Sequence, residues 1–86
     1  MERREIQQRV YDTLGVILVD KTEIREEATL KDLALEDFEI EDFLDQLEYD
    51  FDIIFPTRIK DRISKVPEHL TLQILVDVIL VLRENE

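Results

Sequence analysis

Residues 33–56 read LALEDFEIEDFLDQLEYDFDIIFP, and this stretch decides the fold. Its apolar residues recur at spacings of three and four, which places them on one face of a helix. These residues are Ile40, Phe43, Leu44, Leu47 and Phe51. Asp37 is suited to the N-cap, because its carboxylate can accept hydrogen bonds from the unpaired amides of the first turn. The pattern predicts an amphipathic helix over residues 37–51, followed by a break at Pro56.

A second helix is predicted near the amino terminus, over residues 2–14. Its apolar stripe has a spacing of four and consists of Ile6, Val10 and Leu14. Gly15 is expected to end this helix, because glycine readily adopts the conformation that follows a helix. The connection that comes next is long, so its apolar residues are expected to pin it across the bundle. They are Val16, Ile17, Leu18, Val19, Ile24, Leu30 and Leu33.

Two more helices are predicted after Pro56. The first is short and covers residues 57–64, with Ile59 and Ile63 on one face and Pro67 after its end. The last covers residues 71–83, with Thr71 as its cap and apolar residues on more than one face, which predicts a central position. The sequence therefore predicts an all-α four-helix bundle with three longer helices and one short helix, forming a single domain over residues 1–86.

The net charge of −11 on 86 residues limits the classes of partner. Phosphate backbones and anionic membrane surfaces would repel the chain, so we expect neither nucleic acid nor membrane as a partner. Basic protein surfaces would attract it. The chain has no Cys, which excludes disulfides and thiolate metal sites.

No targeting segment is expected from the amino terminus. Residues 1–9 are charged and are not followed by a signal-like apolar stretch. The most apolar run, residues 70–82, is interrupted by Gln73 and Asp77 and is shorter than the roughly 20 residues that span a bilayer. We interpret it as a core helix and expect a cytoplasmic location.

The chain resembles the acyl carrier proteins over nearly its whole length. That family shows a Leu-Gly-x-Asp-Ser-Leu signature, an acidic helix that ends in Leu-Glu-x-x-Phe, and a turn of the form Asp/Gly-Ile-x-Ile-Pro. Residues 47–56 read LEYDFDIIFP and match the second half without gaps. Residues 28–33, ATLKDL, resemble the lead-in to the signature, and residues 14–16, LGV, resemble the end of the first helix. The resemblance implies an acyl carrier protein-like four-helix bundle and a place in fatty acid biosynthesis or a related lipid or polyketide metabolism.

The signature departs from the family at the residue that carries its chemistry. Ungapped alignment puts Glu36 on the Asp, Asp37 on the Ser and Phe38 on the Leu. The family attaches 4′-phosphopantetheine to that Ser hydroxyl, and a carboxylate offers no hydroxyl. Ser64, the only Ser, lies far downstream beside a basic stretch. We therefore expect no phosphopantetheine and no other cofactor. We also expect no enzymatic activity, because the chain has no Cys, a single His and no nucleophile motif.

The acidic face of helix 37–51 is the candidate partner-binding site. It is either a solvated surface or, as the resemblance implies, a docking face for the basic surface of a synthase or acyltransferase. The candidate residues are Glu36, Asp37, Phe38, Glu41, Asp42, Asp45 and Glu48. Phe38 is either a lid on the core or an anchor for the partner.

Neither catalytic residues nor a metal site are expected. The acidic run lacks the Gly and the alternating oxygen ligands of a calcium-binding loop. The single His69 has no Cys or second His to share a metal, and is interpreted as a surface residue.

The leading hypothesis is thus a monomeric, serine-less interaction module of the acyl carrier protein type. Two alternatives stay open. One is a genuine specialised carrier whose attachment site lies elsewhere, and the other is an unrelated acidic helical inhibitor or binding protein.

Overall fold

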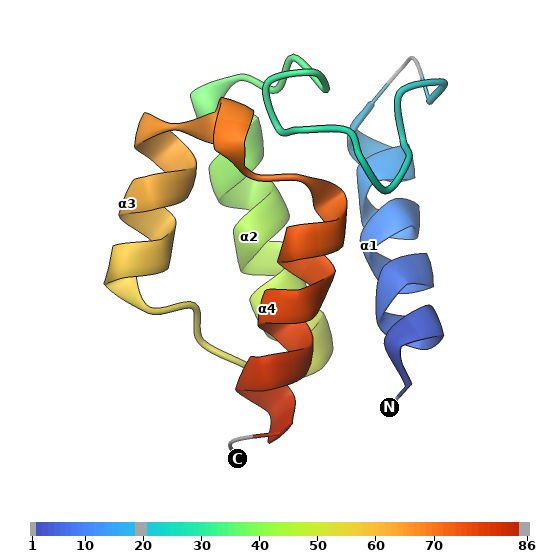
Figure 1. The fold of residues 1–86 in the computed structure, drawn as a ribbon, viewed down its shortest axis with the longest axis vertical. Coiled ribbons are helices and arrows are strands. Elements are labelled where there is room, and N and C mark those ends of the chain that lie inside the picture. Colours follow the sequence, from blue (N-terminus) through green and yellow to red (C-terminus); the bar gives the residue numbers. More distant parts are fainter. Residues whose placement is uncertain (1, 19–20, 85–86) are drawn as a thin grey trace.

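Four α-helices and one 3-10 turn make up the regular structure of the described residues, 2–18 and 21–84, in a computed structural model of the chain (Figure 1). They are α1 (Arg3–Ile17), α2 (Asp37–Phe51), α3 (Thr57–Lys65), η1 (Pro67–His69) and α4 (Leu72–Glu84). Within these residues the only β-type pairing is an isolated bridge between Thr29 and Thr71. The predicted all-α helical bundle is confirmed.

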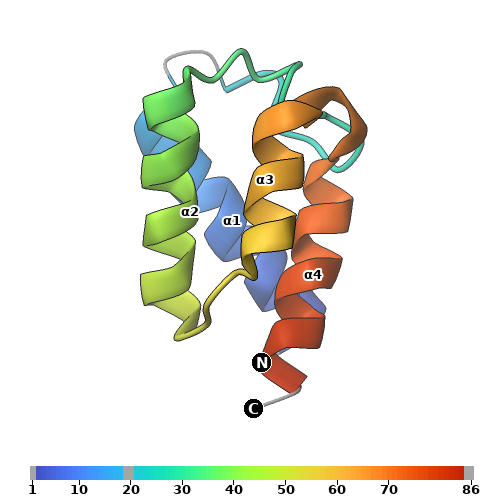
Figure 2. The ribbon, with the colours of Figure 1, turned by 90° about the vertical axis from the view of Figure 1, so that its left-hand side faces the viewer.

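The helices run alternately up and down, so that both ends of the chain lie at the same end of the bundle (Figure 1). α1 packs against both α2 and α4. α3 lies between α2 and α4 on the opposite side from α1 (Figure 2), and its one fully buried side chain is Ile63. A hollow lies on each flank of α2, one lined with residues of α3 and the other with residues of α1.

The core is apolar throughout, and none of its buried residues is polar or charged in the described part of the chain. α2 buries the five side chains that its sequence pattern predicts, from Ile40 to Phe51. α4 buries Leu72, Leu75, Val76 and Ile79 in the same core cluster. None of the described helices has the length and hydrophobicity that a bilayer-spanning segment needs.

α1 is longer than predicted, because Gly15 does not end it. The helix continues to Ile17, and Leu18 is the first residue with an extended backbone, at φ −91° and ψ 136°. Gly15 costs about 1 kcal/mol in a helix, but the last turn places Ile17 against the core. The prediction that Val16 pins the connection is therefore wrong: Val16 is helical and 88% exposed.

The connection between α1 and α2 is tied to the start of α4, as its apolar residues predict. Leu30 N–H donates to the Leu70 carbonyl, and Leu72 N–H donates to the Ala28 carbonyl, both at 3.0 Å. Ala28, Leu30 and Leu33 are buried, while Ile24 packs at the edge of the core. Val19, the remaining apolar residue predicted to pin it, lies outside the described residues.

A reciprocal pair of hydrogen bonds stabilises the turn that follows Thr29. Thr29 N–H donates to Asp32 Oδ2 and Asp32 N–H donates to Thr29 Oγ1, each at 3.0 Å. The backbone hydrogen bond from Thr29, with the Thr29 side chain second, lowers the pKa of the Asp32 carboxyl. The stabilisation from this carboxylate is complete above the ordinary Asp pKa and is lost as the pH falls through the lowered value.

Ala34 has a left-handed backbone conformation, with φ at 54°, which residues other than glycine rarely adopt. This left-handed conformation costs a residue with a Cβ about 1–2 kcal/mol, and glycine avoids most of that cost while losing more entropy on folding. We expect Ala34→Gly to stabilise the protein by about 0.5–1 kcal/mol. The melting temperature in a circular dichroism scan should rise by about 4 °C.

Gly15→Ala is the matched control for that substitution, because it makes the reverse change inside a helix. A Cβ at Gly15 would meet Lys21 Cε at 3.9 Å, which is ordinary contact. We expect Ala here to stabilise by about 0.8–1 kcal/mol. A loss of stability in Ala34→Gly would contradict the left-handed turn, and a loss in Gly15→Ala would contradict the helical conformation of Gly15.

Candidate functional site

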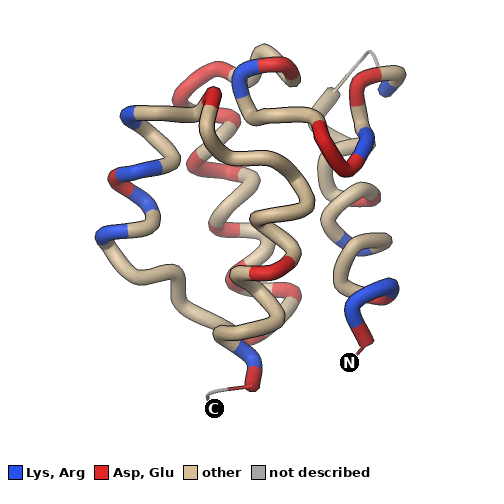
Figure 3. Tube along the Cα trace, viewed as in Figure 1, with Lys and Arg blue, Asp and Glu red and all other residues tan. Residues whose placement is uncertain are grey.

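α2 is strongly acidic and carries no basic residue. Its acidic residues are Asp37, Glu39, Glu41, Asp42, Asp45, Glu48 and Asp50. Along the Cα trace the charged segments of α2 are acidic, whereas most of those on the neighbouring α3 are basic (Figure 3). The field around this helix is negative, so it attracts cationic groups.

The side of α2 opposite its buried face carries two exposed aromatic residues. A rotation of 100° per residue places Phe38, Asp42, Asp45 and Tyr49 along one line, which we name the α2 crest. Phe38 is 63% exposed and Tyr49 is 84% exposed. They are eleven positions apart in the sequence, or about 16 Å along the helix axis. The crest therefore presents two exposed aromatic side chains with carboxylates between them.

The exposure of Phe38 contradicts one of its two predicted roles, that of a lid on the core. Phe38 belongs neither to the buried core nor to the half-buried residues packed against it. It is thus not a lid, and its ring is free to contact a partner. The sequence analysis did not predict Tyr49 as part of this surface. Its position three helical turns after Phe38 would have indicated that the two side chains lie on the same face.

The amino terminus of α2 differs by one residue from the prediction. Glu36 is the N-cap residue, with φ −71° and ψ 159°, and Asp37 is the first helical residue. Glu36 N–H donates to Glu39 Oε1 at 2.9 Å, which closes the first turn. Asp37 therefore makes no cap hydrogen bond, and its carboxylate is exposed at the positive end of the helix dipole.

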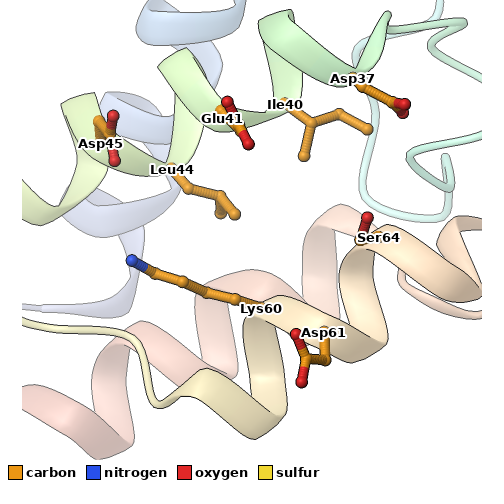
Figure 4. A pocket seen from close by; sticks show the side chains of 8 residues that line it. All are labelled: Asp37, Ile40, Glu41, Leu44, Asp45, Lys60, Asp61 and Ser64. Carbon is orange, nitrogen blue, oxygen red and sulfur yellow. The ribbon is translucent and has the colours of Figure 1, made fainter.

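A groove of about 390 Å³ separates α2 from α3. We name it the α2–α3 groove; its lining residues are Asp37, Ile40, Glu41, Leu44, Asp45, Lys60, Asp61 and Ser64 (Figure 4). Asp37 and Ser64 lie at the same end of the groove, on opposite walls (Figure 4). The hydroxyl of Ser64, the only Ser in the sequence, thus lies in the same hollow as the carboxylate of Asp37.

Glu48 has a structural role that the sequence pattern did not predict. Its side chain is only 18% exposed. Phe55 N–H donates to Glu48 Oε2 at 2.7 Å, and Lys60 Nζ donates to Glu48 Oε1 at 3.3 Å. Glu48 therefore joins α2 to the following loop and to α3, and it is turned away from the crest where Asp42 and Asp45 lie.

The basic residues of the chain concentrate on α3, where Arg58, Arg62 and Lys65 are exposed. Among the described ion pairs, the only one that involves α3 joins Lys60 to Glu48. His69 is exposed in η1, as the sequence predicts. No group of three or more metal-ligating side chains occurs within residues 2–18 and 21–84.

Comparison with known proteins identified no relative of this chain. No family model, curated protein or solved structure matches the chain.

Proposed function

We propose that this chain is an interaction module of the acyl carrier protein type that lacks the attachment serine and docks onto basic surfaces of carrier-dependent enzymes. The observation that carries the proposal is the amino-terminal half of α2. There Asp37 occupies the first helical position, Phe38 is exposed beside it, and carboxylates follow on the open surface. The proposed docking face consists of Glu36, Asp37, Phe38, Glu41, Asp42 and Asp45. Glu48 holds α2 in place through its hydrogen bonds to Phe55 and Lys60.

The backbone before α2 supports this alignment independently of the acidic residues. The ungapped alignment that puts Asp37 on the signature Ser puts Ala34 on the signature Gly. Ala34 has the left-handed conformation, at φ 54°, that glycine adopts most readily. Position 34, whose backbone conformation favours glycine, thus aligns with the glycine of the family's signature.

The fixed charge of Asp37 gives the proposed module a distinct behaviour. A carboxylate at this position is negative, as the phosphate of the family's arm is, but it cannot be modified. The chain would therefore occupy carrier-binding surfaces on synthases or transferases without delivering an acyl group. It would act as a competitor or as a structural subunit rather than as a carrier.

One observation favours a second candidate function, a genuine carrier with its arm on Ser64. Ser64 is exposed and lines the α2–α3 groove together with Asp37. An arm attached there would leave the protein from the same hollow as an arm at residue 37. Ser64→Ala separates this candidate from the first, because it would abolish any modification of the wild-type chain.

Competition with a genuine carrier tests the leading proposal. The assay follows the modification of a serine-bearing acyl carrier protein by a broad-range phosphopantetheinyl transferase, with and without this chain. We expect the wild-type chain to raise the apparent KM for the carrier and to leave kcat unchanged. The physical reason is that both proteins would present an acidic helix to the same basic surface.

Two double variants with equal changes of charge give the control. Asp42→Lys/Asp45→Lys reverses two charges on the α2 crest, whereas Glu68→Lys/Glu84→Lys reverses two exposed charges elsewhere. The first variant should lose the inhibition and the second should keep most of it. Equal loss in both would indicate general electrostatic attraction, and absence of inhibition by the wild type would remove the proposal.

A further inference from the structure

The second open flank of α2, toward α1, has a different chemistry from the α2–α3 groove. A hollow of about 390 Å³ lies there, lined by Asp12, Thr13, Val16, Ile17, Asp42, Gln46 and Asp50. We name it the α1–α2 groove. Val16 and Ile17 supply its apolar lining, which we call the apolar floor although the side chain of Val16 projects into solvent. The Thr13 hydroxyl donates back to the Arg9 carbonyl at 2.9 Å. Val16 is 88% exposed, the largest exposure among the described large hydrophobic residues.

Three carboxylates stand around this apolar floor. Gln8 Nε2 donates to Asp12 Oδ1 at 2.9 Å, and Gln46 Nε2 donates to Asp50 Oδ1 at 3.0 Å. Each of these two carboxylates is thus oriented by a glutamine one turn earlier on its own helix. None of the ion pairs formed by the described residues involves Asp12, Asp42 or Asp50. Two of the three rim carboxylates are therefore oriented by hydrogen bonds, and none of the three is paired with a cationic side chain of the described residues.

An apolar floor with a negative rim selects its ligand by two features at once. Helices that bind in grooves insert apolar side chains at spacings of three and four. Lys or Arg on the flanks of such a helix would meet the three carboxylates, which would otherwise repel one another across the hollow. An acidic segment would be repelled by the carboxylates, and a purely polar segment would leave the apolar floor without an apolar contact.

We propose that the α1–α2 groove is a binding site for a basic amphipathic helix of a partner protein. The site lies on the flank of α2 that faces away from α3, and it shares only Asp42 with the docking face proposed above. It does not depend on the relation to the carriers. An apolar side chain of the partner contacts Val16 and Ile17, and its cationic residues contact Asp12, Asp42 and Asp50.

The test uses the full chain and a synthetic peptide of about 14 residues, four helical turns, with Leu on one face and Lys on the other. A peptide with Glu in place of Lys is the charge control. Titration of ¹⁵N-labelled protein should shift the amide resonances of residues 12–17 and 42–50 most strongly. The Glu peptide should produce no comparable shifts.

Val16→Ser and Ile54→Ser form the matched pair of variants, because both residues are large, apolar and exposed, and Ile54 lies outside the groove. We expect Val16→Ser to weaken peptide binding by about fivefold, since one buried aliphatic contact is lost. Ile54→Ser should change the affinity by less than twofold. Circular dichroism should show both variants folded, because neither side chain is in the core.

The double variant Asp12→Asn/Asp50→Asn tests the electrostatic contribution to binding. Its control is Glu68→Gln/Glu84→Gln, which removes the same number of negative charges outside the groove. The first pair should weaken binding and flatten its dependence on salt more than the second. Three outcomes would overturn the proposal: no binding of the Lys peptide, resonance shifts concentrated on the α2–α3 groove, or equal effects of the two variants in each pair.

Discussion

Asp37→Ser is expected to convert the chain into a substrate for a broad-range phosphopantetheinyl transferase. The substitution places a hydroxyl at the first helical position of α2, between Glu36 and Phe38. The proposed alignment with the acyl carrier proteins puts their attachment serine at this position. Asp37 makes no cap hydrogen bond, so the fold loses only a favourable contact with the helix dipole, at most about 1 kcal/mol. Incubation with coenzyme A and the enzyme should add the mass of one phosphopantetheine arm, measured on the intact protein.

The wild-type chain and a Ser64→Ala background make this experiment decisive. The wild type should stay unmodified under the same conditions, and Asp37→Ser/Ser64→Ala should be modified as readily as Asp37→Ser. Modification of the wild type that disappears in Ser64→Ala would support the second candidate, a carrier with its arm on α3. A folded Asp37→Ser variant that stays unmodified would mean that the docking face no longer fits the enzyme, and a different binding role would be the better account.

The helices could be predicted because each has one dominant pattern. In α2 five large apolar residues fall on a single face, and no other conformation buries them together. Thr71 could be predicted as a cap for a similar reason: its hydroxyl accepts a hydrogen bond from Ile74 N–H at 3.1 Å. Gly15 misled the prediction, because local preference for a helix end was outweighed by the packing of Ile17 two residues later.

The candidate site was harder to predict, because its geometry depends on contacts between helices. Helical spacing alone places Glu48 beside Glu41 and Asp45, yet the loop at Phe55 and Lys60 of α3 turn its carboxylate inward. The position of Ser64 across from Asp37 depends on how α3 folds back after Pro56. Charge and composition indicated an acidic face, but only the packing of α1 and α3 divides it into a crest and two grooves.

Phe43→Ala should destabilise the protein far more than Phe38→Ala, although both remove a phenyl ring from α2. Phe43 is completely buried and Phe38 is 63% exposed. Truncation of a buried Phe to Ala costs about 3–5 kcal/mol, because the lost contacts leave a cavity that the core fills only in part. Truncation of an exposed Phe costs within about 0.5 kcal/mol. Urea denaturation followed by circular dichroism measures both.

The comparison tests the register of α2, on which both proposed surfaces depend. A loss of 3 kcal/mol would lower the melting temperature of a domain of this size by at least ~12 °C, and it is a large part of a typical stability of 5–15 kcal/mol. A similar cost for both substitutions would mean that α2 is rotated from the orientation described here. Phe38 would then belong to the core, and neither the crest nor the rim carboxylates Asp42 and Asp50 would lie where a partner can reach them. A large difference would instead fix Phe38 on the surface, where an aromatic side chain that contributes little to folding is available for binding.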